Sequence, residues 1–158
     1  MGGYVRSVTR VTGSPNIHYY QEASAGSANA FYAGDLVQLD AAGELVIADG
    51  TAILGIAEKT ATGTASTEIP VDVISAEELF IMKSSETTLE AHAQDFGAIT
   101  FTLSATAGHT VASGGANTDE CRIIDHHPAD PWGTLNGRLI VKFLDAELQM
   151  GETLAKAT

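Results

Sequence analysis

Short apolar runs that alternate with glycine-bearing turns dominate the first half of the chain and predict β-strands. The apolar run Leu36–Leu39 leads into turn residues 40–43, and Leu45–Ile47 begins the return, a pattern typical of a β-hairpin. Residues 53–57 form a continuous apolar run that is too short for a free-standing helix and is bounded by turns, which indicates a strand buried on both faces. Gly55 in this run predicts the close approach of another backbone.

Strict alternation of apolar and polar residues predicts two further strands. Glu68–Val73 places its three aliphatic residues on one face, because successive side chains of a strand point to opposite faces. Pro70 in this segment predicts an edge strand or a bulge, since proline cannot donate to a sheet ladder. Ile99–Ser104 alternates in the same way and is one of the clearest strands in the sequence.

The rest of the chain adds shorter elements. Residues 84–94 are predicted to form the one helix, with Ser84 or Ser85 as its N-cap. Further strands are predicted at residues 17–20, near Val111, at residues 121–124 and at residues 138–144. This succession of strands and turns favours a sheet protein over a helical bundle.

Composition agrees with a single β-rich domain. The chain has 158 residues, which suffices for one domain with a hydrophobic core, and aromatic residues make up only 6% of it. We therefore expect a mainly β fold with at most one or two short helices. We expect the β-domain to span residues 23–146, between an extended N-terminal arm at residues 1–22 and a C-terminal tail at residues 147–158.

The pattern of charge bears on the partners of the protein. The formal net charge is −12 and only eight lysine and arginine residues are present, so no nucleic-acid partner is expected, because phosphate neutralisation needs clustered bases. Residues 1–21 carry two arginines and no acid, which indicates a segment that orders on a partner; a frayed terminus is the alternative. The residues predicted to make that contact are Tyr4, Val5, Arg6, Val8, Arg10 and Val11.

No targeting or membrane segment is recognisable in the sequence. A charged start followed by an apolar stretch is missing, and no run of 18 apolar residues could span a bilayer, so we expect no membrane partner and synthesis in a cytoplasm. The single cysteine, Cys121, cannot form an intrachain disulfide, which agrees with a reducing compartment. Because it begins a predicted strand, Cys121 is expected to be a small core residue.

The long loop before the last predicted strand contains the residues with most chemical potential. His126, His127 and Asp130 could in principle hold a divalent metal. We expect no metal there, because adjacent histidines in an extended chain point to opposite faces and the sequence contains no HxxxH or HExxH pair. Pro131 and Trp132 are candidates for an oligomer or surface contact, and Trp132 could equally be a core anchor.

Motifs for catalysis and for nucleotide binding are missing from the sequence. It contains no GxSxG, no Ser-x-x-Lys, no GxGxxG and no Walker A stretch. We therefore expect neither enzymatic activity nor a cofactor.

The order of the strand and turn segments resembles the capsid decoration, or cement, proteins of tailed bacteriophages, and it is similar to the lambdoid head decoration proteins. The resemblance covers about two thirds of the chain, and residues 84–118 have no counterpart in it. It rests on the segments AGDLVQL, GELV, ILGIA, IPVDV, LFIM, CRIID and RLIVKF at residues 33–39, 43–46, 53–57, 69–73, 79–82, 121–125 and 138–143.

This resemblance implies a small β-barrel or β-tulip-like domain that assembles as a homotrimer, with a dimer as the alternative. It implies no chemistry, a place on the outer surface of the virion after synthesis in the cytoplasm of a bacterial host, and the major capsid protein as partner. The expected function is to stabilise the phage head by bridging neighbouring shell subunits.

Two other functions stay open on the sequence. A carbohydrate- or host-surface-binding β-domain would use the loop at residues 125–137, with Trp132 as a stacking platform. A metal-dependent hydrolase would be built on His126, His127 and Asp130.

Overall fold

The computed structural model describes residues 6–23, 30–49, 52–85, 99–104, 108–113 and 121–150. Within these residues the chain forms eleven strands and one short 3-10 helix, so the predicted mainly β fold is confirmed. The elements are, in chain order, β1 (Val8–Arg10), β2 (Ile17–Gln21), β3 (Leu36–Leu39), β4 (Leu45–Ile47), β5 (Gly55–Ala57), β6 (Glu68–Val73), β7 (Phe80–Lys83), β8 (Ile99–Ser104), β9 (Gly108–Ser113), β10 (Cys121–His126), β11 (Arg138–Phe143) and η2 (Asp145–Glu147).

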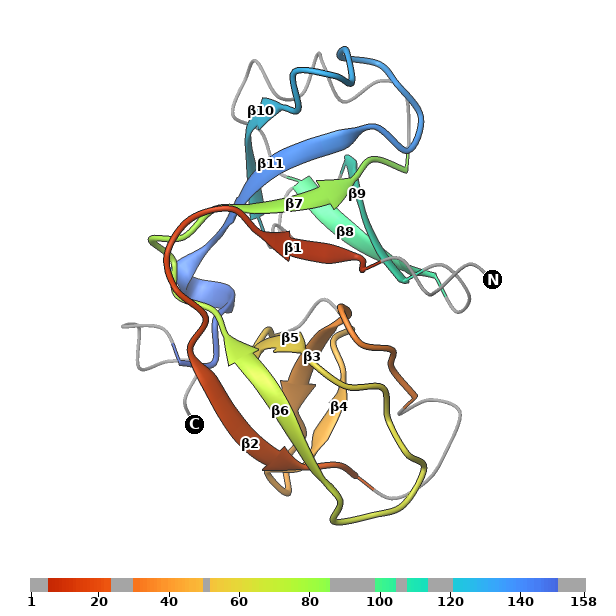
Figure 1. Ribbon diagram of the computed structural model, residues 1–158, viewed down its shortest axis with the longest axis vertical. Coiled ribbons are helices and arrows are strands. Elements are labelled where there is room, and N and C mark those ends of the chain that lie inside the picture. The colour runs from red at the N-terminus through yellow and green to blue at the C-terminus, as the bar shows by residue number, and fades with distance from the viewer. Residues whose placement is uncertain are drawn as a thin grey trace.

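The strands form two antiparallel sheets that lie one above the other along the long axis of the molecule (Figure 1). The six-stranded sheet has the order β1-β7-β11-β10-β8-β9, and the five-stranded sheet has the order β2-β6-β5-β3-β4. The five-stranded sheet curls until its two end strands meet through an isolated parallel bridge between Glu22 and Leu45. In the six-stranded sheet, Ser84, which follows β7, forms such a bridge with Val111 of the end strand β9. The described strands of neither sheet therefore close into a barrel with continuous ladders.

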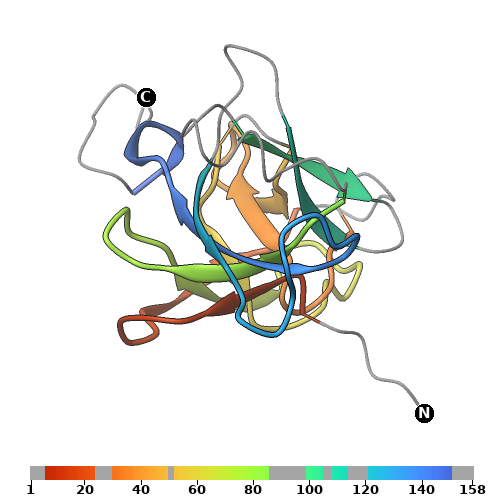
Figure 2. The ribbon, with the colours of Figure 1, turned by 90° about the horizontal axis from the view of Figure 1, so that it is seen from above.

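Two neighbouring segments carry the chain between the sheets. β1 pairs with β7 in the six-stranded sheet, and β2 pairs with β6 in the five-stranded sheet. The pairing continues at the junction, where the N–H of Val11 donates to the carbonyl oxygen of Leu79 at 2.8 Å and the N–H of Val73 donates to that of Asn16 at 2.9 Å. Seen from above, the red N-terminal ribbon runs beside the green one (Figure 2).

The structure corrects the expectation of an extended N-terminal arm at residues 1–22. Residues 6–22 belong to the two sheets, because β1 and β2 each have a strand partner. Val8 is fully buried in the core, so an apolar residue that suggested an adhesive arm packs inside the protein instead. Tyr4 and Val5 lie outside the described residues.

The beginning of the predicted C-terminal tail also packs onto the body. Leu148 is 1% exposed and forms a parallel bridge with Ile53. The side chain of Gln149 accepts the N–H of Leu39 at 2.8 Å and donates to its carbonyl oxygen at 2.9 Å. The body therefore extends to this point, and residues 151–158 lie outside the described residues.

Two hydrophobic cores share the strands of the five-stranded sheet. The larger core lies under the six-stranded sheet and continues into the junction, where it includes Leu36 of β3 and Ile56 of β5. The smaller core lies inside the five-stranded sheet and takes Val37 and Ala57 from the same two strands. Residues 53–57 are accordingly buried throughout, which confirms the prediction of a segment buried on both faces.

Two predictions about single residues of this sheet had different outcomes. A side chain at Gly55 would collide with the backbone of Asp72, so the predicted close approach is confirmed. The prediction that Pro70 marks an edge strand or a bulge is wrong, because β6 lies between β2 and β5 and both of its ladders keep an unshifted register. The proline is tolerated there because β5 ends at Ala57, and beyond that point the carbonyl oxygen of Pro70 accepts the N–H of Glu58 at 2.9 Å.

The start of the predicted helix is extended. Ser84 forms an isolated bridge with Val111, and the N–H of Ser85 donates to the carbonyl oxygen of Val111 at 2.9 Å. The remainder of this prediction, residues 86–94, lies outside the described residues.

Candidate interaction surface

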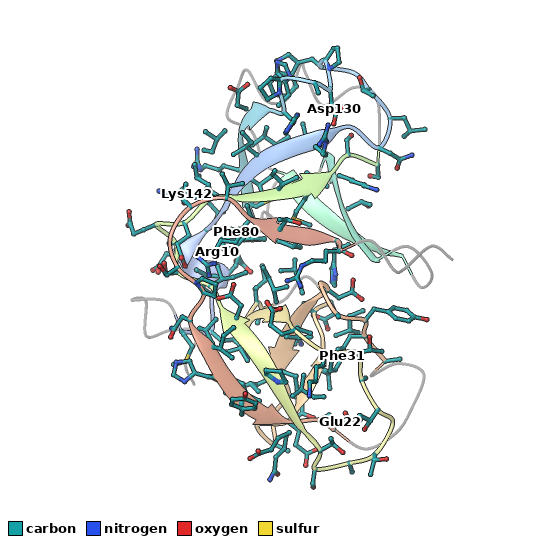
Figure 3. All side chains as sticks on the ribbon, in the orientation of Figure 1. Arg10, Glu22, Phe31, Phe80, Asp130 and Lys142 are labelled. Carbon is teal, nitrogen blue, oxygen red and sulfur yellow. The ribbon has the colours of Figure 1, made fainter. Side chains whose placement is uncertain are left out.

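An ionic contact joins the two sheets at their junction. Arg10 of β1 donates to both carboxylate oxygens of Asp72 on β6, from Nε at 3.0 Å and from Nη2 at 2.7 Å. Its Nη1 contacts Glu78, and its guanidinium carbon lies 5.0 Å from the centre of the Phe80 ring. Figure 3 shows Arg10 and Phe80 near this junction. We call Arg10, Asp72 and Glu78 the ionic joint; its bidentate geometry compensates charges that are costly to bury alone.

A neutral contact joins the same two sheets elsewhere, and we call His109 with its backbone partners the neutral joint. His109 of β9 is 1% exposed. Its Nδ1 accepts the N–H of Leu36 at 3.2 Å, and its Nε2 lies 3.1 Å from the carbonyl oxygen of Ala48, so the Nε2 nitrogen carries the proton. Burial lowers the pKa of His109, against the raising effects of the Ala48 carbonyl and of the Asp35 carboxylate.

A buried carboxylate supports the neutral joint. Asp35 is 1% exposed, and its Oδ1 accepts the hydroxyl of Ser7 at 2.6 Å while its Oδ2 accepts the N–H of Tyr32 at 2.9 Å. Its Oδ1 lies 4.0 Å from Nδ1 of His109. Because Ser7 precedes β1, this carboxylate also links the start of the six-stranded sheet to the loop before β3.

The loop that suggested a metal site uses its polar groups internally. Nδ1 of His126 lies 2.9 Å from the carbonyl oxygens of both His127 and Asp130, and Nδ1 of His127 accepts the N–H of Ala129 at 3.1 Å. The carboxylate of Asp130 accepts a hydrogen bond from Nε of Arg138 at 2.6 Å. Within the described part of the chain, no three histidine, cysteine or acidic side chains converge on a metal position.

The ion pair between Asp130 and Arg138 is partly exposed, and it changes the pKa of Asp130 strongly. Hydrogen bonds from the side chain and then from the backbone N–H of Arg138 lower the pKa of Asp130 from 3.8 to about 2. The same contact raises the pKa of Arg138. Figure 3 places Asp130 in the lobe of the six-stranded sheet, far from the junction, so this ion pair orders the loop and does not join the sheets.

Trp132 acts mainly as a packing residue. It is partly buried against the larger core, and its ring centroid lies 4.9 Å from that of His126 at an interplanar angle of 59°. Pro131 next to it is exposed. Of the two roles that the sequence left open for Trp132, the structure therefore favours the core anchor.

The residues predicted to touch a partner from the N-terminal segment are not presented together. Val8 is buried and Arg10 belongs to the ionic joint. Arg6 donates from two nitrogens to the carboxylate of Glu58, each at 3.1 Å. Val11 is 45% exposed. Of the described residues in this set, Val8 and Arg10 are thus used within the protein, and contact of the set with a partner stays a prediction.

A surface that the sequence did not single out lies along β2. Ile17 is 41% exposed and Tyr19 is 65% exposed, although both belong to a strand. β2 is at the edge of the five-stranded sheet, and its sequence IHYYQ contains no acidic residue, lysine or arginine. We call residues Ile17–Gln21 the β2 edge. The sequence alone does not reveal this surface, because the exposure of Ile17 and Tyr19 depends on the position of the strand in the sheet.

An open pocket of about 490 Å³ adjoins the β2 edge. The side of the strand that carries His18 and Tyr20 lines it, and Met150 contributes a side chain that is 63% exposed. The other lining residues are Asn16, Val73, Ile74, Ser75 and Glu78. The pocket therefore combines apolar walls with a few polar groups, the usual makeup of a site that receives a ligand or a partner side chain.

None of the described helical segments is long and apolar enough to cross a membrane. Comparisons of the chain with protein-family models, with curated proteins and with solved structures find no match.

Proposed function

We propose that this chain is a structural virion protein that binds the outside of a phage head and stabilises the capsid by bridging shell subunits. The partner in this proposal is the major capsid protein, and the protein associates with itself, most simply as a homotrimer. Support comes from the resemblance of its strand segments to the capsid decoration proteins and from the mainly β body.

The observation that carries the proposal is the β2 edge. A strand with exposed Ile17 and Tyr19 and without charged residues stands on a protein of net charge −12. Exposed apolar groups on an otherwise acidic protein indicate a contact surface, because their burial against a partner is favourable and the surrounding acids keep the unbound protein in solution.

The rigid body explains how such a surface could strengthen a shell. Two sheets that are joined by an ionic and a neutral contact can transmit force between two attachment points with little deformation. A protein that binds only the assembled shell stabilises that state by mass action. An oligomer that grips several subunits gains effective concentration for each further contact.

The test is co-sedimentation of the purified protein with empty phage heads, together with a measurement of its mass in solution. We expect saturable binding and a higher temperature for head disruption. Tyr19→Ser should weaken binding, whereas Tyr32→Ser, which removes another tyrosine that is 45% exposed, should not. A correctly folded protein that leaves heads unbound and no more stable would refute the proposal.

A further inference from the structure

The backbone of the β2 edge has hydrogen-bonding groups directed away from its sheet. Among the described strands, β6 is the only ladder partner of β2. The carbonyl oxygen of Asn16 accepts the N–H of Val73 at 2.9 Å, and the N–H of Glu22 donates to the carbonyl oxygen of Thr67 at 2.8 Å. Residues that face the partner strand alternate along an antiparallel ladder, so the even-numbered residues between these two also face β6.

The odd-numbered residues of β2 consequently turn their peptide groups to the open side. These residues are Ile17, Tyr19 and Gln21. A second extended chain could bond to Ile17 and Tyr19 without disturbing the ladder with β6, because none of the bonds to β6 uses their N–H or carbonyl groups. Gln21 is not available in the same way, because the bridge between Glu22 and Leu45 and the bond from the N–H of Ala23 to the carbonyl oxygen of Leu45 place β4 beside this end of β2. The β2 edge is thus a template for strand addition.

Both faces of the β2 edge offer contacts for the side chains of an added strand. Tyr19 is more exposed than any other tyrosine among the described residues. Ile17 lies two positions before it, on the same face of the strand. On the opposite face, His18 and Tyr20 border the pocket of about 490 Å³. Alternate side chains of an added strand would therefore meet an exposed aromatic and aliphatic pair on one side and a pocket on the other.

The charge of the protein selects the chemistry of the added strand. Acids outnumber lysine and arginine by twenty to eight over the whole chain. Three of those bases, Arg6, Arg10 and Arg138, already pair with carboxylates of the same chain. A partner segment with lysine or arginine at its ends is attracted by the remaining acids, whereas a second copy of this acidic chain is repelled.

We propose that the β2 edge binds an extended polypeptide segment with alternating apolar residues and basic ends by strand addition. Identification of that segment with a part of the phage shell rests on the proposed function; the strand addition itself does not. The bound segment forms backbone hydrogen bonds with Ile17 and Tyr19 and places alternate side chains in the pocket beside β2.

The binding test uses a synthetic peptide of sequence Lys-Val-Thr-Val-Thr-Val-Thr-Val-Lys with blocked ends. Fluorescence anisotropy gives its affinity for the full chain, and amide hydrogen exchange gives the site. We expect the amides of Ile17 and Tyr19 to gain protection with peptide, while those of His18 and Tyr20 are protected with or without it. A peptide with glutamate at both ends should bind at least about tenfold more weakly at low salt.

The matched variants are Tyr19→Pro and Tyr19→Thr. Both remove the aromatic ring, but only proline also removes the N–H that faces the open side, and proline is tolerated at such an edge position. We expect peptide affinity to be about tenfold lower for Tyr19→Pro than for Tyr19→Thr, since one backbone bond and its geometry are lost. Equal unfolding temperatures of the two variants establish that proline leaves the fold intact.

The outcomes are distinguishable. Equal affinities of the two variants, binding without protection of the amides of Ile17 and Tyr19, or no peptide binding at all would overturn the proposal. A doubled mass with the same protection in the absence of peptide would identify a second copy as the occupant and refute the basic partner. If the peptide binds as expected but the protein does not bind phage heads, the proposed function fails and strand addition stands. If phage heads bind the Tyr19→Pro variant as well as the natural chain, the β2 edge is not the contact with the shell.

Discussion

The ionic joint and the neutral joint connect the same two sheets by opposite electrostatic means. At the ionic joint, Arg10 and Asp72 keep their charges, and their side chains are 10% and 4% exposed. At the neutral joint, His109 is 1% exposed, its Nδ1 accepts the N–H of Leu36 as a neutral ring does, and burial lowers its pKa. The ionic joint thus pairs a buried acid with a guanidinium that keeps some contact with water, whereas the neutral joint places a neutral ring with two backbone partners beside the buried Asp35 carboxylate.

This difference indicates that the joints should respond differently to mutation and to pH. Removal of one member of an ionic pair leaves a buried charge without its partner, which costs more than loss of a neutral hydrogen bond. A neutral imidazole, in contrast, is sensitive to protons, because protonation converts its acceptor nitrogen into a donor.

The largest effect is expected from Asp72→Ala. It leaves Arg10 with Glu78 and the carbonyl oxygen of Thr12, and it removes the acceptor of the Asn16 N–H, which lies 2.9 Å from Oδ1 of Asp72. The free energy of unfolding should fall by about 3 to 5 kcal/mol, as measured by urea denaturation. The double variant Arg10→Met with Asp72→Ala should recover part of this loss. If Asp72→Ala alone lowers the free energy of unfolding by less than about 1 kcal/mol, the ionic joint contributes little to stability.

A somewhat smaller loss is expected from His109→Phe. The phenyl ring fills the space of the imidazole but leaves the N–H of Leu36 and the carbonyl oxygen of Ala48 without this partner. We expect a loss of about 2 to 4 kcal/mol in the free energy of unfolding. His109→Gln, which keeps an acceptor and a donor, should lose less. Equal losses for the two variants would assign the effect to packing and not to the hydrogen bonds.

The pH dependence of stability separates the joints further. The pKa of His109 is lowered in the folded protein from its ordinary value of 6.5, so the unfolded chain binds the proton more readily. The contribution of His109 to the free energy of unfolding is therefore complete above pH 6.5. It decreases as the pH falls below that value, with a slope of up to about 1.4 kcal/mol per pH unit.

Urea denaturation between pH 7.5 and 5.5 tests this linkage. The difference in unfolding free energy between the natural chain and His109→Gln should shrink as the solution becomes more acidic, because only the natural chain carries the titrating imidazole at this position. A difference that stays constant over this range would contradict the neutral state of the joint.

The smallest effect is expected from Glu58→Gln. Its ion pair with Arg6 has two hydrogen bonds of 3.1 Å, but the side chain of Arg6 is 39% exposed and that of Glu58 is 28% exposed. Water and salt screen such a pair, so the unfolding free energy should change by less than about 1 kcal/mol. A loss as large as that of Asp72→Ala would mean that exposure does not distinguish the ion pairs of this protein.

The β2 edge shows how local pattern and global position contribute to a surface. The sequence predicts a strand at residues 17–20, and the structure contains it as Ile17–Gln21. The same sequence cannot show that this strand lies at the edge of a sheet, since that depends on which strands pair with β6 and on where β5 ends. Pro70 illustrates the same limit, because its local effect predicted an edge where the sheet has an interior strand.

Local patterning by itself determined many of the strands of this protein, although not β1, which was expected to belong to an extended arm. Alternation and turn residues indicated the hairpin of β3 and β4, the doubly buried segment at residues 53–57 and the strands β6, β8 and β11, because side-chain direction follows sequence spacing in any extended chain. Only the tertiary structure decided the joints. Arg10 and Asp72 are 62 positions apart and Leu36 and His109 are 73 apart, and no local rule relates such residues until the two sheets pack.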